Sequence, residues 1–126
     1  MLNKICTDLE TSKKLKELGI EMDSNYVWEW VRRKGENLSV LRYYKNADQR
    51  DAFLTYYDPK AYTLEQILEM FIYKGTIDIY RGKNGYFGIN FNNEISYYRQ
   101  DGDNMTTTAA KLLIRLVEGK TIKIGE

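Results

Sequence analysis

The fold is decided by residues 76–92, which read TIDIYRGKNGYFGINFN. Apolar and polar residues alternate in both halves of this stretch, which is typical of two half-buried strands joined by a turn. A two-residue turn at the Asn-Gly pair would place apolar residues opposite polar ones, whereas a three-residue loop aligns Ile77 with Phe91 and Ile79 with Ile89. Because the longer loop keeps the apolar side chains on one face, we predict that register.

Three stretches with helical spacing of apolar residues flank the strands. A capping-box pattern opens the first helix at Thr7 and the second at Thr63, and a glycine ends each of them. The third helix follows Asp103 or Asn104, either of which can cap it, and runs to about Glu118. Each helix has one apolar face, so we expect all three to pack onto a sheet.

Residues 25–45 predict a two-stranded hairpin, because the apolar period changes from helical spacing to two. A register that pairs Trp30 with Val40 and Tyr26 with Tyr44 gathers the aromatic residues on one face. We therefore expect this register, and we expect the hairpin to supply half of the core.

The order helix, hairpin, helix, three-stranded meander, helix predicts an α+β fold with a mainly antiparallel sheet. The meander strands are expected near residues 76–81, 86–92 and 94–100. With 126 residues and 14.9 kDa, the chain is expected to form one domain, residues 1–126. Residues 46–62 show no clean period, so we expect a long connection there, which is either functional or merely crosses from hairpin to helix.

The composition excludes several kinds of chemistry. The chain has no His and a single Cys, so it offers no imidazole base for a Ser or Cys nucleophile and too few ligands for a structural zinc site. The loop from Asp101 to Asn104 resembles the start of a calcium loop, but Leu112 stands where such a loop needs a bidentate glutamate. We therefore expect neither an enzyme nor a bound metal or other cofactor.

The net charge of +1 leaves no basic field that would capture a phosphate backbone or an anionic membrane. Duplex DNA and membranes are therefore not expected as partners. The sequence contains no apolar run of signal-peptide or membrane-spanning length. On this ground we expect a cytoplasmic protein.

Tyrosine is unusually frequent, at 11 of 126 residues. On the predicted register one face of the meander is rich in tyrosine and asparagine, with basic residues at the strand ends, and its candidate ligand-binding residues are Tyr80, Tyr86, Asn90, Tyr98, Arg81, Arg99 and Lys83. Tyrosine rings stack on ligands and short polar side chains hydrogen-bond them, as on the sheets that bind single-stranded RNA. The alternative is that the hairpin or a partner subunit covers this face.

Two parts of the sequence resemble a known family. They are the segment from Lys4-Ile5-Cys6-Thr7 to Glu17-Leu18-Gly19-Ile20, and the later segment Pro59-Lys60-Ala61-Tyr62-Thr63-Leu64, in which Lys60 is an insertion. The family consists of small uncharacterised proteins encoded by gut bacteria of the Bacteroides type and by their phages and prophages. The resemblance is confined to the N-terminal third and this later segment. It implies a small accessory protein, phage- or prophage-borne, that works by binding.

Together these observations predict a non-enzymatic binding protein that sequesters a small nucleotide-like ligand or blocks a host protein, with counter-defence as a role that fits the phage-like setting. A homo-oligomer is expected, because a chain of this size gains a deep pocket most easily at a subunit interface. The alternative is a single-stranded nucleic-acid-binding protein that uses the same tyrosine-rich face.

Overall fold

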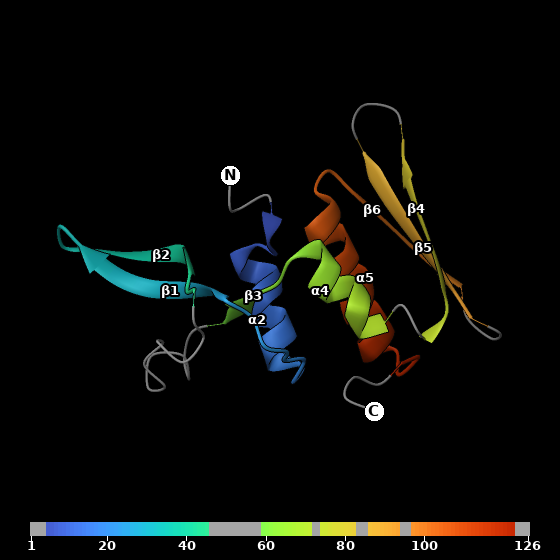
Figure 1. Cartoon of the computed structure of the whole chain (residues 1–126), viewed down its shortest axis with the longest axis horizontal. Coiled ribbons are helices and arrows are strands. Elements are labelled where there is room, and N and C mark those ends of the chain that lie inside the picture. The colour runs from blue at the N-terminus through green and yellow to red at the C-terminus, as the bar shows by residue number, and fades with distance from the viewer. Residues whose placement is uncertain (1–4, 46–58, 72–73, 83–85, 94–96, 123–126) are drawn as a thin grey trace.

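A computed structural model of the chain describes residues 5–45, 59–71, 74–82, 86–93 and 97–122. Its elements are, in chain order, α2 (Leu9–Glu17), β1 (Tyr26–Arg33), β2 (Glu36–Tyr43), β3 (Lys60–Ala61), α4 (Leu64–Phe71), β4 (Thr76–Arg81), β5 (Phe87–Asn92), β6 (Tyr97–Gly102) and α5 (Met105–Glu118). The predicted α+β class and antiparallel pairing are confirmed. The strands form two three-stranded sheets, ordered β2-β1-β3 and β4-β5-β6, and the helices lie between them (Figure 1).

The main core lies between the helices and one face of the meander β4-β5-β6. Ile89 and Phe91 of β5 are fully buried there, against a cluster that includes Phe71 of α4 and Leu112 and Leu116 of α5. This burial explains the apolar stripes of both helices, because each stripe removes its side chains from water against the sheet. Within the described residues, no helix is long and apolar enough to cross a membrane.

The predicted register of β4 with β5 is confirmed, with Ile77 opposite Phe91 and Ile79 opposite Ile89. The loop at residues 83–85, which we predicted to have three residues with a left-handed Gly85, lies outside the described residues. The third meander strand was predicted too early, since β6 begins at Tyr97, opposite Asn92. Four residues, 93–96, therefore connect the strands, and this even number reverses the faces that we expected for β6.

The helix caps match the sequence patterns in two cases out of three. Thr63 and Gln66 form the predicted reciprocal capping box, with a 2.9 Å bond from the Thr63 N–H to Gln66 Oε1 and a 3.3 Å bond from the Gln66 N–H to Thr63 Oγ1. Asn104 caps α5 through Thr107. The prediction for α2 was wrong, because Asp8 is its N-cap, and its carboxylate accepts a 2.8 Å bond from the Thr11 N–H.

The hairpin register was also predicted wrongly, by one residue. Tyr26 pairs with Tyr43 and Trp30 with Ser39, because a two-residue turn joins the strands. Lys34 and Gly35 both have positive φ, of 51° and 77°, as the tight turn that suits the twist of a hairpin requires. The turn geometry therefore sets the register. Tyr43 replaces Tyr44 on the aromatic face, where the rings of Tyr26 and Tyr43 lie 5.1 Å apart. The Tyr44 hydroxyl instead donates to Glu29 on the other face.

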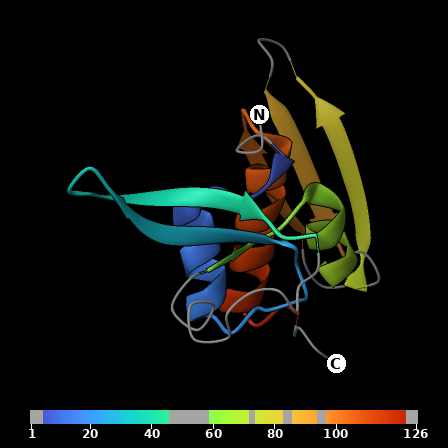
Figure 2. The ribbon, with the colours of Figure 1, turned by 60° about the vertical axis from the view of Figure 1, so that its left-hand side comes forward.

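The hairpin does not supply half of the core, as we had expected. Figures 1 and 2 show β1 and β2 extending away from the helices as an arm. None of its described side chains belongs to the core cluster, and Trp30 is 66% exposed. The buried side chains of the arm are those of Val27, which is fully buried, and Glu29, which is 7% exposed.

Residues 59–62, which the sequence assigned to a long connection, instead join the two halves of the fold. Lys60 and Ala61 form β3 beside β1. Tyr62 and Thr7 exchange two hydrogen bonds: the Thr7 N–H donates to Tyr62 O over 2.9 Å, and the Tyr62 N–H donates to the Thr7 side-chain Oγ1 over 3.2 Å. The Thr7 hydroxyl also bonds Ser12 over 2.7 Å. The Thr7 hydroxyl therefore serves this junction and not the α2 N-cap. Residues 46–58 lie outside the described residues.

We predict that Thr7→Val lowers the free energy of unfolding by about 1–3 kcal/mol, because the substitution preserves shape but leaves the buried Tyr62 N–H without an acceptor. Urea denaturation measures this loss. Thr76→Val is the matched control, because Thr76 is exposed at the start of β4. Equal stability of the two variants would show that the junction is energetically unimportant.

Candidate functional site

The outer face of the meander, turned away from the helices, carries a row of three residues across the sheet. Tyr80 of β4 pairs with Gly88 of β5, which pairs with Asp101 of β6. A Cβ added at Gly88 would lie 2.1 Å from Cζ of Tyr80, so the tyrosine ring lies directly over the glycine. The absence of a side chain at Gly88 therefore fixes the position of the Tyr80 ring.

Arg99 completes a polar cluster on this row. The Tyr80 hydroxyl donates a 3.0 Å hydrogen bond to Asp101 Oδ1, and Arg99 Nε donates a 3.2 Å bond to the same oxygen. The Arg99 guanidinium also lies over the Tyr80 ring, 5.1 Å from its centroid. The ring is thus held between the backbone of Gly88 and the guanidinium, with its hydroxyl already bonded.

The cluster keeps its charges over a wide pH range. The hydrogen bond from Tyr80, and then that from Arg99, holds the pKa of Asp101 below its ordinary value of 3.8. Loss of hydration, followed by the bond to Asp101, raises the pKa of Tyr80, and Asp101 raises the pKa of Arg99. At neutral pH the site therefore presents an ionised carboxylate, a cation and a neutral phenol.

An open hollow of about 360 Å³ lies beside this cluster. It is lined by Tyr80, Gly82, Tyr86, Phe87, Arg99 and Asp101. Tyr86 is 56% exposed, and the guanidinium of Arg81 lies 5.7 Å from the ring centroid of Phe87. We call this feature the meander hollow. It gathers the rings of Tyr80 and Tyr86 and the guanidinium of Arg99 around the carboxylate of Asp101, which Tyr80 and Arg99 already bind. Arg81 is not part of it, because Arg81, Phe87 and Gly102 form the next row of the sheet, whose side chains lie on the face toward α5.

The structure brings together some of the residues that the sequence singled out. Tyr80, Tyr86 and Arg99 line the meander hollow. Arg81 does not, because it pairs with Phe87 on the face of Ile89 and Phe91, which corrects our expectation. Asn90 lies on the same face, opposite Arg99, and its Oδ1 is buried without a hydrogen-bond partner in the described part of the chain. Lys83 lies outside the described residues.

Tyr98 is placed on the opposite face, which corrects our expectation. It pairs with Phe91, whose side chain points into the core, and its hydroxyl shares a 3.1 Å hydrogen bond with Thr121. The guanidinium of Arg115, from α5, lies 5.4 Å from its ring centroid. The reason is the longer connection before β6, which reverses the faces of that strand. Tyr97, 63% exposed, takes the outer face instead.

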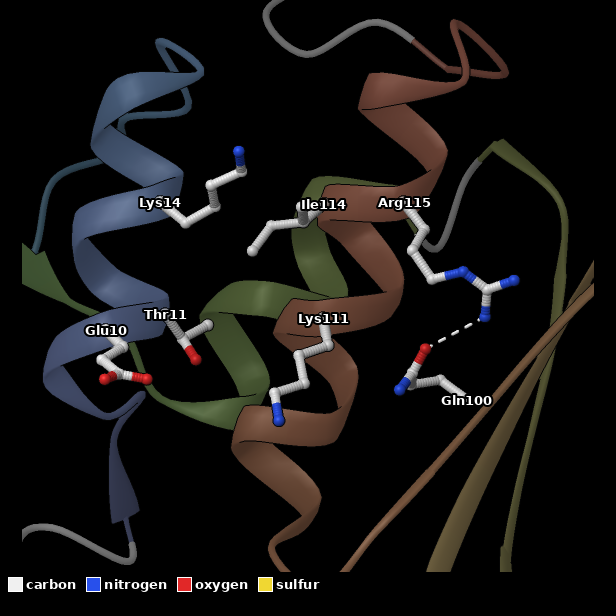
Figure 3. A pocket seen from close by; sticks show the side chains of 7 residues that line it. All are labelled: Glu10, Thr11, Lys14, Gln100, Lys111, Ile114 and Arg115. Atoms are coloured by element: carbon white, nitrogen blue, oxygen red, sulfur yellow. Dashed lines mark hydrogen bonds between the residues drawn. The ribbon is translucent and has the colours of Figure 1, made fainter.

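A second hollow, which sequence reasoning missed, lies between α2 and α5 (Figure 3). This helix groove has a volume of about 380 Å³ and is lined by Glu10, Thr11, Lys14, Gln100, Lys111, Ile114 and Arg115. Lys14 and Lys111 reach into the gap between the helices, while Arg115 faces β6 and donates a 3.0 Å bond to Gln100 Oε1. In the sequence Lys14 is one of several lysines of the first helix, which are typical of a solvated helix face. No local signal reveals that α5, about ninety residues later, lies beside it.

The described residues hold no cluster of three or more Cys, Asp or Glu side chains arranged to bind a metal. Cys6 is buried, and burial raises the pKa of its thiol to about 11. This thiol is therefore protonated at neutral pH and is a poor nucleophile. What the meander hollow offers is recognition by stacking, cation–π contact and charge-assisted hydrogen bonds.

Comparisons with protein-family models, with curated proteins and with solved structures found no match. The family resemblance of the N-terminal third therefore stays a prediction, and the function is inferred below from the geometry of the meander hollow.

We predict that Tyr80→Phe raises the pKa of Asp101 toward 3.8, because the mutation removes the largest contribution that lowers it. Since the folded-state pKa is the lower one, this contact stabilises the fold above the ordinary carboxyl pKa and is lost as pH falls through the folded value. An NMR titration of the Asp101 carboxyl carbon measures the shift. Tyr86→Phe, which removes no bond to Asp101, should leave the titration unchanged; the same pKa in wild type and Tyr80→Phe would refute the assignment.

Proposed function

We propose that the protein is a non-enzymatic binding protein that sequesters a small nucleotide-like ligand in the meander hollow. The observation that carries this proposal is the convergence of Tyr80, Tyr86 and Phe87 with the guanidinium of Arg99 around one open hollow. A ligand with a planar ring and an anionic group matches this lining, because the aromatic side chains suit the ring and the guanidinium suits the anionic group. The volume of about 360 Å³ is at the lower end of the range for small-molecule sites.

The planar part of the ligand would stack on the side chains that are free to receive it. The Tyr80 ring already has Gly88 on one side and Arg99 on the other. The Arg99 guanidinium plane and the exposed Tyr86 ring therefore offer the stacking surfaces, since bases stack on both kinds of plane.

The anionic part would be met by Arg99. Its guanidinium uses Nε to bond Asp101, which leaves its terminal nitrogens as donors. A phosphate at the mouth of the hollow would gain charge-assisted hydrogen bonds from this side chain.

The helix groove supports this function less well. It offers the cations Lys14, Lys111 and Arg115 but no aromatic ring among its lining residues. The Arg115 guanidinium also has hydrogen-bond partners already, because its Nη1 donates to Arg99 O and to Gln100 Oε1. The groove therefore lacks a surface on which a base would stack.

We predict that Tyr86→Ala weakens the binding of mononucleotides by about tenfold or more, because stacking on one aromatic side chain is worth about 1–3 kcal/mol. Isothermal titration calorimetry with a panel of purine and pyrimidine mononucleotides measures this effect. Tyr97→Ala is the matched control, because Tyr97 is exposed on the same face but lies outside the hollow. Equal losses in the two variants, or no binding of any mononucleotide by the wild type, would refute the proposal.

We also predict that Gly88→Ala weakens binding, because the added methyl group collides with the Tyr80 ring and displaces it together with Arg99. This variant keeps every side chain of the hollow, so it tests their positions rather than their presence. Circular dichroism checks that the sheet is retained. Unchanged affinity in a folded Gly88→Ala protein would show that the position of Tyr80 does not matter for binding.

Salt dependence separates this function from the binding of single-stranded nucleic acid. A strand that neutralises several cations loses affinity steeply as salt rises, with a slope of about −0.7 per phosphate contact in a plot of log affinity against log salt. A mononucleotide held by one arginine should show only a shallow slope. A steep slope with oligonucleotides, together with no mononucleotide binding, would favour the alternative function.

A further inference from the structure

The arm formed by β1 and β2 extends well beyond the short strand β3 that pairs with its base. The strand β3 pairs only with Tyr26 and Val27, and Pro59 adds one bond to Trp28, so beyond Trp28 the arm is a two-stranded ribbon in the described structure. Isolated two-stranded hairpins are marginally stable in water. Yet this ribbon carries Trp30, 66% exposed, and Leu38, 40% exposed. Its composition fits a sheet that continues beyond these two strands.

The outer edge of β2 is where the sheet can continue. The Tyr44 N–H donates to Asn25 O, and hydrogen-bonded pairs alternate along an antiparallel ladder. The backbone groups of the even-numbered residues of β2 therefore bond β1, and those of Asn37, Ser39, Leu41 and Tyr43 point outward. Among the described residues no strand pairs with this edge.

The edge also lacks three of the features that prevent strands from pairing, namely lysine, proline and a bulge. Protected edges are short, or carry lysine, proline or a bulge. The strand β2 runs for eight residues, ENLSVLRY, without lysine or proline, and its register against β1 is unbroken.

We propose that β2 pairs with β2 of a second copy of this chain, around a two-fold axis at Ser39, to form the four-stranded sheet β1-β2-β2-β1. This inference concerns a different surface from the meander hollow and does not rest on the proposed ligand. It gives the homo-oligomer expected from the sequence a specific interface.

The charges of β2 select this register. The residues whose backbone N–H and C=O groups point outward must lie opposite each other in the two strands. Only registers that pair odd-numbered with odd-numbered residues therefore form hydrogen bonds between the two edges. Among these, the register with Ser39 opposite Ser39 of the second copy places Glu36 opposite Arg42 of the second copy, and symmetry forms this pair twice. Arg42 contacts Glu29 through Nε, which leaves its terminal nitrogens for Glu36. Glu36 has no other ion-pair partner among the described residues.

The same register accounts for the exposed indole. Trp30 lies opposite Ser39 on β1 and β2, so the dimer aligns Trp30, Ser39, and the Ser39 and Trp30 of the second copy in one row on one face. The two tryptophans are then roughly 14 Å apart, since neighbouring strands are about 4.8 Å apart. The two small serines between them leave room for both indoles to lean inward and cover apolar surface that is exposed in the monomer.

The first test is the mass of the full chain in solution. Sedimentation velocity over a concentration series should show a species of twice 14.9 kDa. Ser39→Pro should abolish it, because proline removes the outward N–H at the two-fold axis but no donor to β1. Ser39→Ala keeps the N–H and should stay dimeric, and Glu36→Lys should weaken the dimer by about tenfold because it places like charges opposite each other.

Far-UV circular dichroism and thermal unfolding establish that the Ser39→Pro chain is folded. A wild type that is monomeric at every concentration would overturn the proposal. A dimer that survives both Ser39→Pro and Glu36→Lys would also overturn it, since the interface would then lie elsewhere.

The second test reports the register directly, because it detects a crosslink that forms rather than an interaction that is lost. Ser39→Cys places two thiols on the two-fold axis, where Cα atoms about 5.5 Å apart suit a disulfide. Asn37→Cys is the matched control on the same edge and face, with its two copies roughly 13 Å apart in this register. The native Cys6 is buried and does not compete. We expect mild oxidation to crosslink Ser39→Cys only; crosslinking of Asn37→Cys, or of neither variant, would overturn the proposed register.

Discussion

The mutual hydrogen bonding of Thr7 and Tyr62 is the constraint on which the rest of the structure depends. Each residue donates its backbone N–H to the other, and Trp28 Nε1, from the arm, adds a 3.0 Å bond to Thr7 O. Ser12 brings α2 to the same point through its hydroxyl. Both central residues are buried, so none of these polar groups can exchange its partner for water. The first helix, the arm and the segment that leads into α4 are therefore fixed relative to one another.

This junction also explains why the arm extends from the body. The base of β1 is fixed on the side of β3, where the Trp28 N–H donates to Pro59 O over 2.9 Å and Ser24 Oγ donates to Ala61 O over 2.6 Å. Beyond Trp28 no third strand continues among the described residues, and the helices have already filled the space against the meander. The strands β1 and β2 thus leave the core at Trp28, and the exposure of Trp30 follows from this geometry.

The sequence predicted the parts of the fold that apolar patterning determines, and it failed where backbone geometry decides. The register of β4 and β5 was predictable because Ile89 and Phe91 must share the buried face. The hairpin register depends on Lys34 adopting a left-handed conformation, which lysine does not signal. The same limit affected the candidate site: Tyr80 and Tyr86 were found from a face pattern and Arg99 from its position near a strand end, whereas the placement of Tyr98 depends on the register of β6.

The arrangement of the two proposed surfaces changes what an oligomer would do for this protein. From the sequence, oligomerisation was expected to deepen a pocket at the subunit interface. In the structure the arm and the meander lie at opposite ends of the molecule, with the helices between them (Figure 1). A dimer joined through β2 would therefore leave each meander hollow complete within one copy and distant from the other. Such an assembly gives no added affinity for a single small ligand, but it gains avidity for any target that presents two ligand groups at a matching distance.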